Sequence, residues 1–399
     1  MDLTIHPGKL SGSLSIIPSK SQAHRLLICA AFSDGKTELL CPDTNRDIEA
    51  TVACLKTLGA EIRRTTFGYE IEPVRCVPAS AVLPCRDSGS TLRFLLPVAG
   101  ALDVEADFLL EGRLAQRPLS PLWEEMERMG CILSFPNETT LHCTGKLQSG
   151  EYTIRGDVSS QFISGLLFGA MLIPGQTRIT VTGKLESKPY VDMTLDALHC
   201  FGCTAKDFTV IGGKALTSPG ELTVEGDWSN GAFFLAANAL GNNIFTQNLS
   251  DTSLQGDRAA ADLIPQLKQQ HCTISAANIP DLVPILSIVA ACNHGAVFTE
   301  IQRLRLKESD RVESVISMVT ALGGSAEADE TTLTIHGTGL NGGTVDCRND
   351  HRIAMSAAIA ATTCRESVTL LGAECVAKSY PDFFEIYRRL GGNYEQHLR

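Results

Sequence analysis

The chain has 399 residues, of which 44% are apolar and 20% charged, and its formal net charge is −11. This length suffices for two domains, each with a core of its own. The acidic balance, without a basic stripe, argues against nucleic-acid binding, and no apolar run approaches the roughly 18–20 residues that span a bilayer. We therefore expect neither a nucleic acid nor a membrane among the partners.

The N-terminal residues and the cysteines indicate the compartment. Residues 1–8 lack a basic segment followed by an apolar one, so we expect no signal peptide. The 14 cysteines lie mostly inside apolar segments, which is typical of buried, reduced thiols. These features predict a cytoplasmic protein.

The first polar stretch of interest, Pro18–Arg25, lies between two apolar runs. Ser19 and Ser21 are good N-cap residues, so a buried helix should begin here with unpaired backbone N–H groups. Lys20 and Arg25 add two positive charges to the positive end of that helix. This composition is typical of an anion site, although a capped helix with two solvated cations would have the same sequence.

A polar phrase followed by apolar and small residues recurs along the whole chain. The six phrases begin near Ser19, Asp87, Asp157, Asp227, Asp281 and Asp350. The intervals between them are 68, 70, 70, 54 and 69 residues. Each phrase should open a buried helix, and a second, amphipathic helix with a charged face should follow in each unit. Alternating segments such as 177–181 and 332–335 predict half-exposed strands.

This repeat predicts an α/β protein of two similar domains. Three buried helices enclosed by sheets would make one domain, so six units make two. The short fourth interval suggests that the second half receives a strand from the N-terminus. If the six helix starts point the same way within their domains, they meet in one cleft between the halves.

Further candidate binding groups lie in the later phrases. Gly89, in a Gly-containing helix start, can bring backbone N–H groups close to an anion. Arg117 lies in a loop, where a guanidinium can bind a carboxylate or phosphate in bidentate fashion, although a solvated arginine is the commoner case. Ser159, Ser160 and Gln161 offer hydroxyl and amide donors at another helix start.

The densest charged cluster is residues 303–311. Its alternation up to Leu306 predicts a strand that gives way to a helix, with Lys307, Glu308 and Arg311 at the junction. A solvated ladder of ion pairs would look similar. Asp281 differs, because it is a lone carboxylate beside a wholly apolar helix. It is either an N-cap or a group suited to proton transfer.

The sequence also lacks the motifs of several common catalytic chemistries. It has no GxxxxGK[ST] phosphate loop, no HExxH zinc motif and no GxSxG nucleophile elbow. What remains is a set of cations that bind anions, with carboxylates and a lysine that move protons. We therefore expect no metal and no cofactor.

In this order, the motifs resemble those of the 5-enolpyruvylshikimate-3-phosphate (EPSP) synthases over the whole chain. They are SKSQAHR, SGSTLR, QRP, SSQF, SKPYVDMT, LRLKESDR, NDHRIAMS and AKSYPD. The resemblance implies an inside-out α/β barrel fold of two domains, each with three βαβαββ units. It also implies domains of residues 13–225 and of 1–12 with 226–399, with the active site in the cleft between them.

The resemblance implies a reaction and a set of site residues. The enolpyruvyl group of phosphoenolpyruvate would pass to the 5-hydroxyl of shikimate 3-phosphate, and phosphate would be released. Shikimate 3-phosphate would contact Lys20, Ser21, Arg25, Ser159, Ser160, Gln161, Ser187, Asp281 and Lys307. Phosphoenolpyruvate would contact Lys20, Gly89, Arg117, Gln161, Arg311, Arg352 and Lys378.

For the chemistry, the resemblance implies that Asp281 accepts the hydroxyl proton and that Glu308 or Lys20 protonates the methylene carbon of phosphoenolpyruvate. Two positions depart from the family pattern. Asp87 stands where relatives usually have Asn, either near the phosphoenolpyruvate site or as a helix cap. Arg303 replaces an Asn found in some relatives and adds a cation.

Three other functions compete with this interpretation. A UDP-N-acetylglucosamine enolpyruvyl transferase would need a reactive cysteine in a mobile loop, and residues 105–128 contain none. A non-catalytic anion-binding protein on the same scaffold would have lost some of the charged positions. An RNA-end-modifying relative would need a basic face. We expect a monomer, because the two halves already make a complete cleft.

Overall fold

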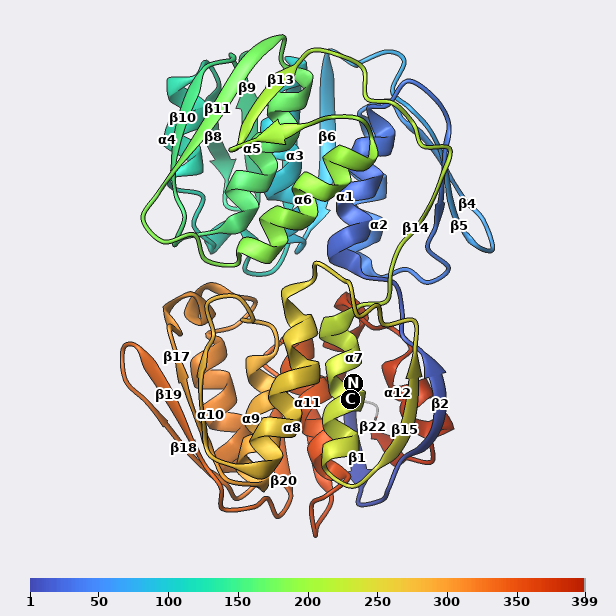
Figure 1. Cartoon of the computed structure of the whole chain (residues 1–399), viewed down its shortest axis with the longest axis vertical. Helices are drawn as coiled ribbons and strands as arrows, with labels where there is room; N and C mark the ends of the chain where they lie inside the picture. Colours follow the sequence, from blue (N-terminus) through green and yellow to red (C-terminus); the bar gives the residue numbers. More distant parts are fainter. Residues whose placement is uncertain (398–399) are drawn as a thin grey trace. The chain divides into compact units, whose positions relative to one another are not determined.

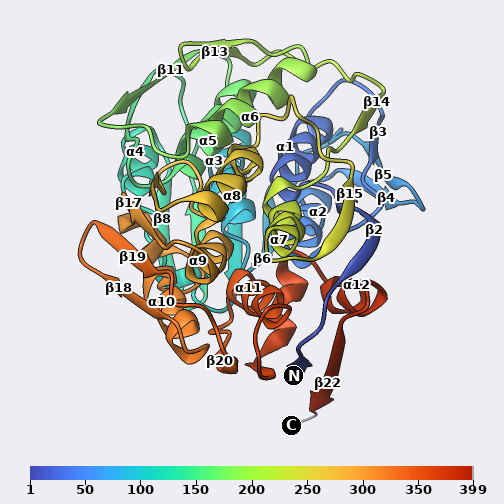
Figure 2. The ribbon, with the colours of Figure 1, turned by 60° about the horizontal axis from the view of Figure 1, so that its bottom comes forward.

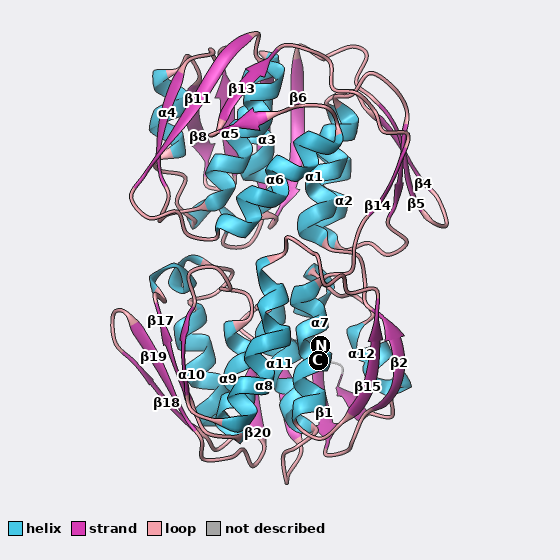
Figure 3. Cartoon of the chain, viewed as in Figure 1, coloured by secondary structure: helices cyan, strands magenta, loops and turns pink. Residues whose placement is uncertain are grey.

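The computed structural model describes residues 1–397, which divide into two compact units. Unit 1 comprises Met1–Ile17 and Gly226–Arg399, and unit 2 comprises Pro18–Glu225. Each unit has its own apolar core. In both units the helices lie inside and the strands outside, as Figure 1 and, by secondary structure, Figure 3 show.

Unit 2 is built around helices that are buried along most of their length. They are α1 (Lys20–Ala31), α3 (Gly89–Leu102) and α5 (Ser160–Leu172). Helices α3 and α5 pack very closely, because a Cβ on Gly165 would lie 2.0 Å from the carbonyl oxygen of Arg93. The second helix of each repeat has a more exposed face. These helices are α2 (Arg46–Thr57), α4 (Leu122–Arg128) and α6 (Lys188–Cys200).

Three four-stranded sheets enclose these helices, and all have the same strand order. The first is β14 (Glu221–Thr223), β3 (Thr37–Leu40), β5 (Gly68–Glu72) and β4 (Glu61–Arg64). The second is β6 (Ser80–Arg86), β7 (Glu105–Leu110), β9 (Thr140–Thr144) and β8 (Ile132–Asn137). The third is β10 (Glu151–Arg155), β11 (Gly175–Thr182), β13 (Thr209–Gly212) and β12 (Ala205–Lys206). In each sheet the first pair is parallel and the others are antiparallel.

Unit 1 repeats this plan. Its buried helices are α7 (Trp228–Ala239), α9 (Val283–Cys292) and α11 (His351–Ala361). They pack against one another, as the turned view in Figure 2 shows. The accompanying helices are α8 (Ala260–Gln269), α10 (Arg311–Ala321) and α12 (Phe383–Arg389).

The N-terminal residues complete two sheets of unit 1. One sheet is β20 (Gly343–Asp346), β21 (Val368–Leu371), β1 (Asp2–His6) and β22 (Asn393–His397). The pair β15 (Asn243–Gln247) and β2 (Ser11–Ser15) is parallel, so β2 supplies a strand to the short fourth repeat. The remaining sheet is β16 (Cys272–Ser275), β17 (Ala296–Thr299), β19 (Thr332–His336) and β18 (Ser325–Ala328). Because β2 pairs with β15, the boundary expected near residue 12 lies instead after Ile17.

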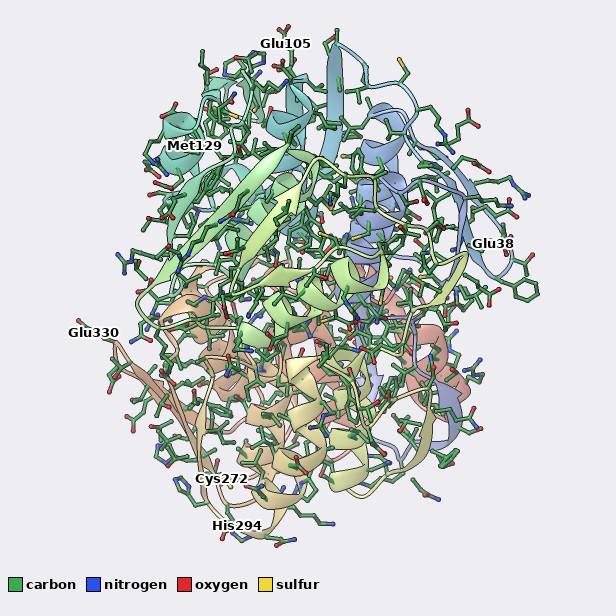
Figure 4. The ribbon with its side chains drawn as sticks, turned by 45° about the horizontal axis from the view of Figure 1, so that its top comes forward. Glu38, Glu105, Met129, Cys272, His294 and Glu330 are labelled. Atoms are coloured by element: carbon green, nitrogen blue, oxygen red, sulfur yellow. The ribbon has the colours of Figure 1, made fainter. Side chains whose placement is uncertain are left out.

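Acidic side chains lie at the outer edges of the two units. Figure 4 shows Glu38, Glu105 and Glu330 at the periphery of their units, where all three are exposed. Within residues 1–397, no helix combines the length and the apolar character that crossing a membrane requires. Most cysteines are buried as expected, but Cys76 and Cys200 are exposed.

Candidate active site

Polar side chains cap the N-termini of most of the buried helices. The Oγ of Ser19 accepts a hydrogen bond from the backbone N–H of Gln22 and so caps α1. Ser88, Ser159, Asp227 and Asp350 cap α3, α5, α7 and α11 in the same way. Helix α9 differs, because its cap position is Leu282 and no side chain accepts a hydrogen bond there. Asp281 is therefore not an N-cap, and its carboxylate is available for other contacts.

In unit 2, Lys20 forms an ion pair with a carboxylate that sequence reasoning did not single out. Its Nζ lies 2.9 Å from Oδ2 of Asp47, in the first turn of α2. Both side chains are largely buried, with 14% and 6% of their surface exposed. An ion pair with this little contact with water is screened less than a surface pair.

Arg25 is held by neutral acceptors. Its Nε donates to Oγ1 of Thr194 at 2.8 Å, and its two Nη atoms donate to the carbonyl oxygens of Ser21 and Tyr190. Burial lowers the pKa of the Arg25 guanidinium to about 10, which still leaves it charged at neutral pH. The guanidinium also lies over the Phe94 ring, 5.0 Å from its centroid. Arg25 thus joins α1 to α6 and α3 with its positive charge retained.

Gly89 and Gln161 lie beside two further arginines. A Cβ on Gly89 would lie 2.7 Å from an Nη atom of both Arg93 and Arg117, so a larger residue there would displace the two guanidinium groups from their present positions. Gln161 accepts from Arg93 at 3.3 Å and donates to Ser90 at 3.0 Å. The Nε of Arg117 is buried, and the described residues offer it no hydrogen-bond partner. The starts of α3 and α5 therefore form one polar surface with at least two cations.

The serines expected at the site also lie at helix starts. Ser159 is the N-cap of α5, and Ser160 is its first residue and is buried. Ser187 is the N-cap residue of α6, with a left-handed backbone (φ 54°), and is also buried. Helix α6 packs against both α1 and α5, so Ser187 belongs to the same helix group as Lys20 and Ser160.

In unit 1, the expected residues converge on Asp281. Arg311 Nη1 lies 2.7 Å from its Oδ1, Arg352 Nη2 lies 2.9 Å from its Oδ2, and Lys307 Nζ lies 3.9 Å from its Oδ1. Arg311 also bonds Glu308 at 2.7 Å and Asp350 at 3.1 Å. We call Asp281, Lys307, Glu308, Arg311, Asp350 and Arg352 the Asp281 cluster.

The electrostatics of this cluster follow from burial and close charges. Burial opposes ionisation of Asp281, but Arg352, Lys307 and Arg311 outweigh it and hold the pKa of the carboxyl well below its ordinary value. Burial lowers the pKa of Lys307 to about 8, although the Asp281 carboxylate raises it in part. Burial acts to lower the pKa of Arg311, but Asp350, Glu308 and Asp281 together raise it. At neutral pH Asp281 is thus ionised, Lys307 is largely protonated and Arg311 is charged.

A second buried acid lies near this cluster. Asp257, in the 3-10 turn η2 (Gly256–Ala259), bonds the hydroxyl of Ser229 at the start of α7. Burial raises its pKa to about 7, with a further rise from the Asp281 charge and an opposing effect of Arg352. Asp257 is therefore about half protonated near neutral pH.

Other sequence predictions have mixed outcomes. Residues 302–306 form a 3-10 turn, η3 (Gln302–Leu306), and not the strand that the alternation predicted. Lys378 ends η4 (Ala373–Lys378), which packs against α11, and its side chain is buried. The cap of α3 is Ser88 and not Asp87. Across residues 1–397, no three His, Cys, Asp or Glu side chains are grouped as metal ligands.

Sequence reasoning missed the acidic partners of these cations. Asp47 and Asp257 carried no signal beyond acidic residues near helix starts, where carboxylates are common. Asp350 was seen only as a helix opener, yet its Oδ2 also accepts from Ser309 Oγ at 3.0 Å and from Arg311.

Comparison with known proteins identifies the family. The family model for EPSP synthase (3-phosphoshikimate 1-carboxyvinyltransferase) matches residues 5–387. The chain is 39% identical to a 3-phosphoshikimate 1-carboxyvinyltransferase of Clostridium kluyveri and 36% identical to one of Clostridioides difficile. Each alignment covers 99% of this chain and 98% of the relative.

Solved structures agree on the fold. Two structures of EPSP synthase from Acinetobacter baumannii superimpose with TM-scores of 0.80 and 0.81. They cover 99% and 100% of this chain at 21% and 20% identity. Together with the family match over most of its length, this shows that the chain belongs to the EPSP synthase (3-phosphoshikimate 1-carboxyvinyltransferase) family.

Proposed function

We propose that this protein transfers the enolpyruvyl group of phosphoenolpyruvate to the 5-hydroxyl of shikimate 3-phosphate and releases phosphate, in the biosynthesis of chorismate and the aromatic amino acids. Family membership supports the reaction. The observation that carries it is the Asp281 cluster, in which one carboxylate contacts two guanidinium groups and faces an ammonium group. This arrangement supplies a base and anion-binding cations in the same place.

Shikimate 3-phosphate binds mainly to the unit of residues Pro18–Glu225. Lys20, Ser21 and Arg25 bind its phosphate, together with the hydroxyl and amide groups at the starts of α5 and α6. These groups belong to Ser159, Ser160, Gln161 and Ser187. The neutral partners of Arg25 leave its charge uncompensated, which supports a role in holding a phosphate. Asp281 and Lys307 contact the ring hydroxyls.

Phosphoenolpyruvate binds to the remaining cations. In unit 2 these are Arg117, beside Gly89 and Gln161, with Lys20. In unit 1 they are Arg311, Arg352 and Lys378. The two sets contact the same ligand. An increase in compactness on addition of shikimate 3-phosphate, measured by small-angle scattering, tests this, and identical scattering curves would contradict it.

The cations are needed because both substrates are polyanions. Two like charges about 5 Å apart repel by about 3 kcal/mol at an effective dielectric constant of about 20, and several such pairs form when the reacting carbons meet. Fixed guanidinium and ammonium groups offset this repulsion without reorganising during the reaction.

The proton transfers are assigned to Asp281 as base and to Lys20 or Glu308 as acid. Asp281 accepts the proton of the 5-hydroxyl as the oxygen forms its bond to C2 of phosphoenolpyruvate. The C2–C3 electron pair takes a proton at C3 from Lys20 or Glu308, which gives a tetrahedral intermediate. The donor then takes back a proton from C3, and phosphate departs with the proton that Asp281 held, which restores the double bond and the starting protonation states.

A phosphate-release assay tests the function. Purified protein is mixed with phosphoenolpyruvate and shikimate 3-phosphate, with each substrate alone, and with UDP-N-acetylglucosamine in place of shikimate 3-phosphate. Release should require both proposed substrates and should persist with a chelator. Release with the sugar nucleotide instead would favour the rival transferase, and no release with either acceptor would favour a binding protein.

The setting of the reaction belongs to the same proposal. The enzyme works in the cytoplasm. It works as a monomer, since each substrate contact named above comes from one chain. Sedimentation analysis at micromolar concentration should give the mass of one chain, and a dimer would contradict this part.

A further inference from the structure

The cations proposed to bind phosphoenolpyruvate in unit 1 are already engaged. Both oxygens of Asp281 contact a guanidinium, Oδ1 with Arg311 at 2.7 Å and Oδ2 with Arg352 at 2.9 Å. The Arg311 side chain is fully buried and that of Arg352 is 4% exposed, so water does not readily replace Asp281 as the partner of either guanidinium. An incoming anion therefore meets two occupied guanidinium groups.

The charges of the cluster balance before any substrate arrives. The carboxylates of Asp281, Glu308 and Asp350 stand against the cations of Lys307, Arg311 and Arg352. A neutral cluster offers little net attraction to a polyanion unless an internal carboxylate gives way. The attraction becomes strong only when such a carboxylate moves off its arginines.

Asp281 is the carboxylate that contacts both arginines, whereas the ion pairs of Glu308 and Asp350 are with Arg311, so movement of Asp281 frees both guanidinium groups. Asp350 is fully buried, caps α11 through Oδ1 and holds Arg311 and Ser309 through Oδ2, so its movement would disturb a helix. Asp281 caps no helix, and 19% of its side chain is exposed. Asp350 can keep the Nε side of Arg311 fixed while Asp281 leaves its Nη1.

The same ion pairs oppose the chemistry assigned to Asp281. The positive charges of Arg352, Lys307 and Arg311 outweigh burial and hold the pKa of its carboxyl well below the ordinary range. A base in that state takes a hydroxyl proton poorly, because catalytic efficiency rises as the pKa of the base approaches the working pH. Release from the two arginines would remove their part of this effect and so raise the pKa of the carboxyl.

We propose, on the basis of the function proposed above, that Asp281 is an internal competitor of phosphoenolpyruvate for Arg311 and Arg352. The carboxylate of phosphoenolpyruvate takes over the two guanidinium groups, and Asp281 turns from them toward the ring hydroxyl. The base is thus released only when its reaction partner is bound. Proton abstraction then proceeds as described, with the hydroxyl electron pair forming the bond to C2.

Substitution of Asp281 by asparagine tests the competition. Asp281→Asn keeps the size of the side chain but removes the charge, so phosphoenolpyruvate no longer competes with an internal carboxylate. Calorimetric titration with phosphoenolpyruvate alone should give a Kd at least about fivefold lower than for the wild type. A purely structural or substrate-binding role for Asp281 would leave this Kd unchanged or raise it.

A matched control removes one charge from the same region. Glu313 lies in the first turn of α10 beside Arg311 in sequence, but its carboxylate is exposed and pairs only loosely with Arg305, at 3.6 Å. Glu313→Gln changes the net charge by the same amount and should leave the Kd of phosphoenolpyruvate within about twofold of the wild type. An equal gain in both variants would overturn the proposal, because the effect would then be one of general charge.

A second measurement uses the wild type, so it does not depend on whether the variant folds. Carbon-13 NMR of labelled aspartates follows the Asp281 carboxyl in the wild type, and its titration midpoint should move to higher pH when phosphoenolpyruvate is saturating. An unchanged titration would overturn the proposal. If the wild type releases phosphate from both substrates while neither experiment shows the expected change, the competition alone is wrong and the proposed function stands.

Discussion

The close packing of α3 and α5 predicts that a substitution favoured by helix propensity will destabilise this protein. Gly165 lies within α5, where alanine would ordinarily stabilise by about 1 kcal/mol. Here the new Cβ would lie 2.0 Å from the carbonyl oxygen of Arg93 and 3.1 Å from its carbon. Both atoms are backbone, so relief requires the helices to separate by about 1 Å. Overpacking of this kind costs typically about 1–3 kcal/mol or more.

We therefore expect Gly165→Ala to lower the free energy of unfolding by about 2 kcal/mol net, measured from the urea midpoint. Gly169→Ala is the matched comparison, because its Cβ would lie 3.0 Å from the Pro97 carbonyl oxygen and should change stability by less than about 1 kcal/mol. The separation should also loosen the contacts of Gln161 with Ser90 and Arg93 and raise the KM for phosphoenolpyruvate. A Gly165→Ala variant as stable as the wild type would refute the close packing.

Three further predictions follow from the charged residues. Lys307, with a pKa of about 8, loses its proton as pH rises through 8, so kcat/KM should fall above that pH. Lys307→Arg should move this fall to higher pH, and the same pH profile for the wild type and the variant would contradict the assignment. Between about pH 4 and 7 Asp257 binds a proton in the folded state but not in the unfolded state, so the free energy of unfolding falls as pH rises across this range. Asp257→Asn should reduce this pH dependence in urea unfolding, and an unaltered pH dependence would show that other groups cause it. Arg25→Lys keeps the charge, but its single nitrogen cannot reach the three acceptors that the separate Nε and Nη atoms of the guanidinium reach, so the Kd of shikimate 3-phosphate should rise at least tenfold in calorimetry. An unchanged Kd would remove Arg25 from the site.

The starts of the buried helices were predictable because capping is local. A Ser or Asp before an apolar run is enough to place a cap, and Ser19, Asp227 and Asp350 are caps in the structure. The errors arose where the local signal was ambiguous. Asp87 and Ser88 are adjacent and both suit an N-cap, and Ser88 is the residue that caps α3. The alternation before Lys307 suggested a strand, but these residues form a 3-10 turn.

The acidic partners of the cations could not be predicted, because they come from distant parts of the chain. Asp47 is 27 residues from Lys20, and Asp281 is 71 residues from Arg352. No periodicity or spacing rule joins such pairs, which depend on how the repeats pack. The strand that the N-terminus donates to the second half was predicted from the short fourth interval, and β2 supplies it by pairing with β15. The end of the donated segment was not predictable, because it depends on contacts across the units' own cores, and these group residues up to Ile17 with unit 1.

In the proposed reaction Asp281 takes the hydroxyl proton, and one comparison tests this directly. Phosphate release from phosphoenolpyruvate and shikimate 3-phosphate is measured for the wild type and for Asp281→Ala, with circular dichroism to show that the variant is folded. Turnover of Asp281→Ala should be lower by about 10²-fold or more, the loss expected when a general base is removed. Turnover close to that of the wild type in a folded variant would contradict it.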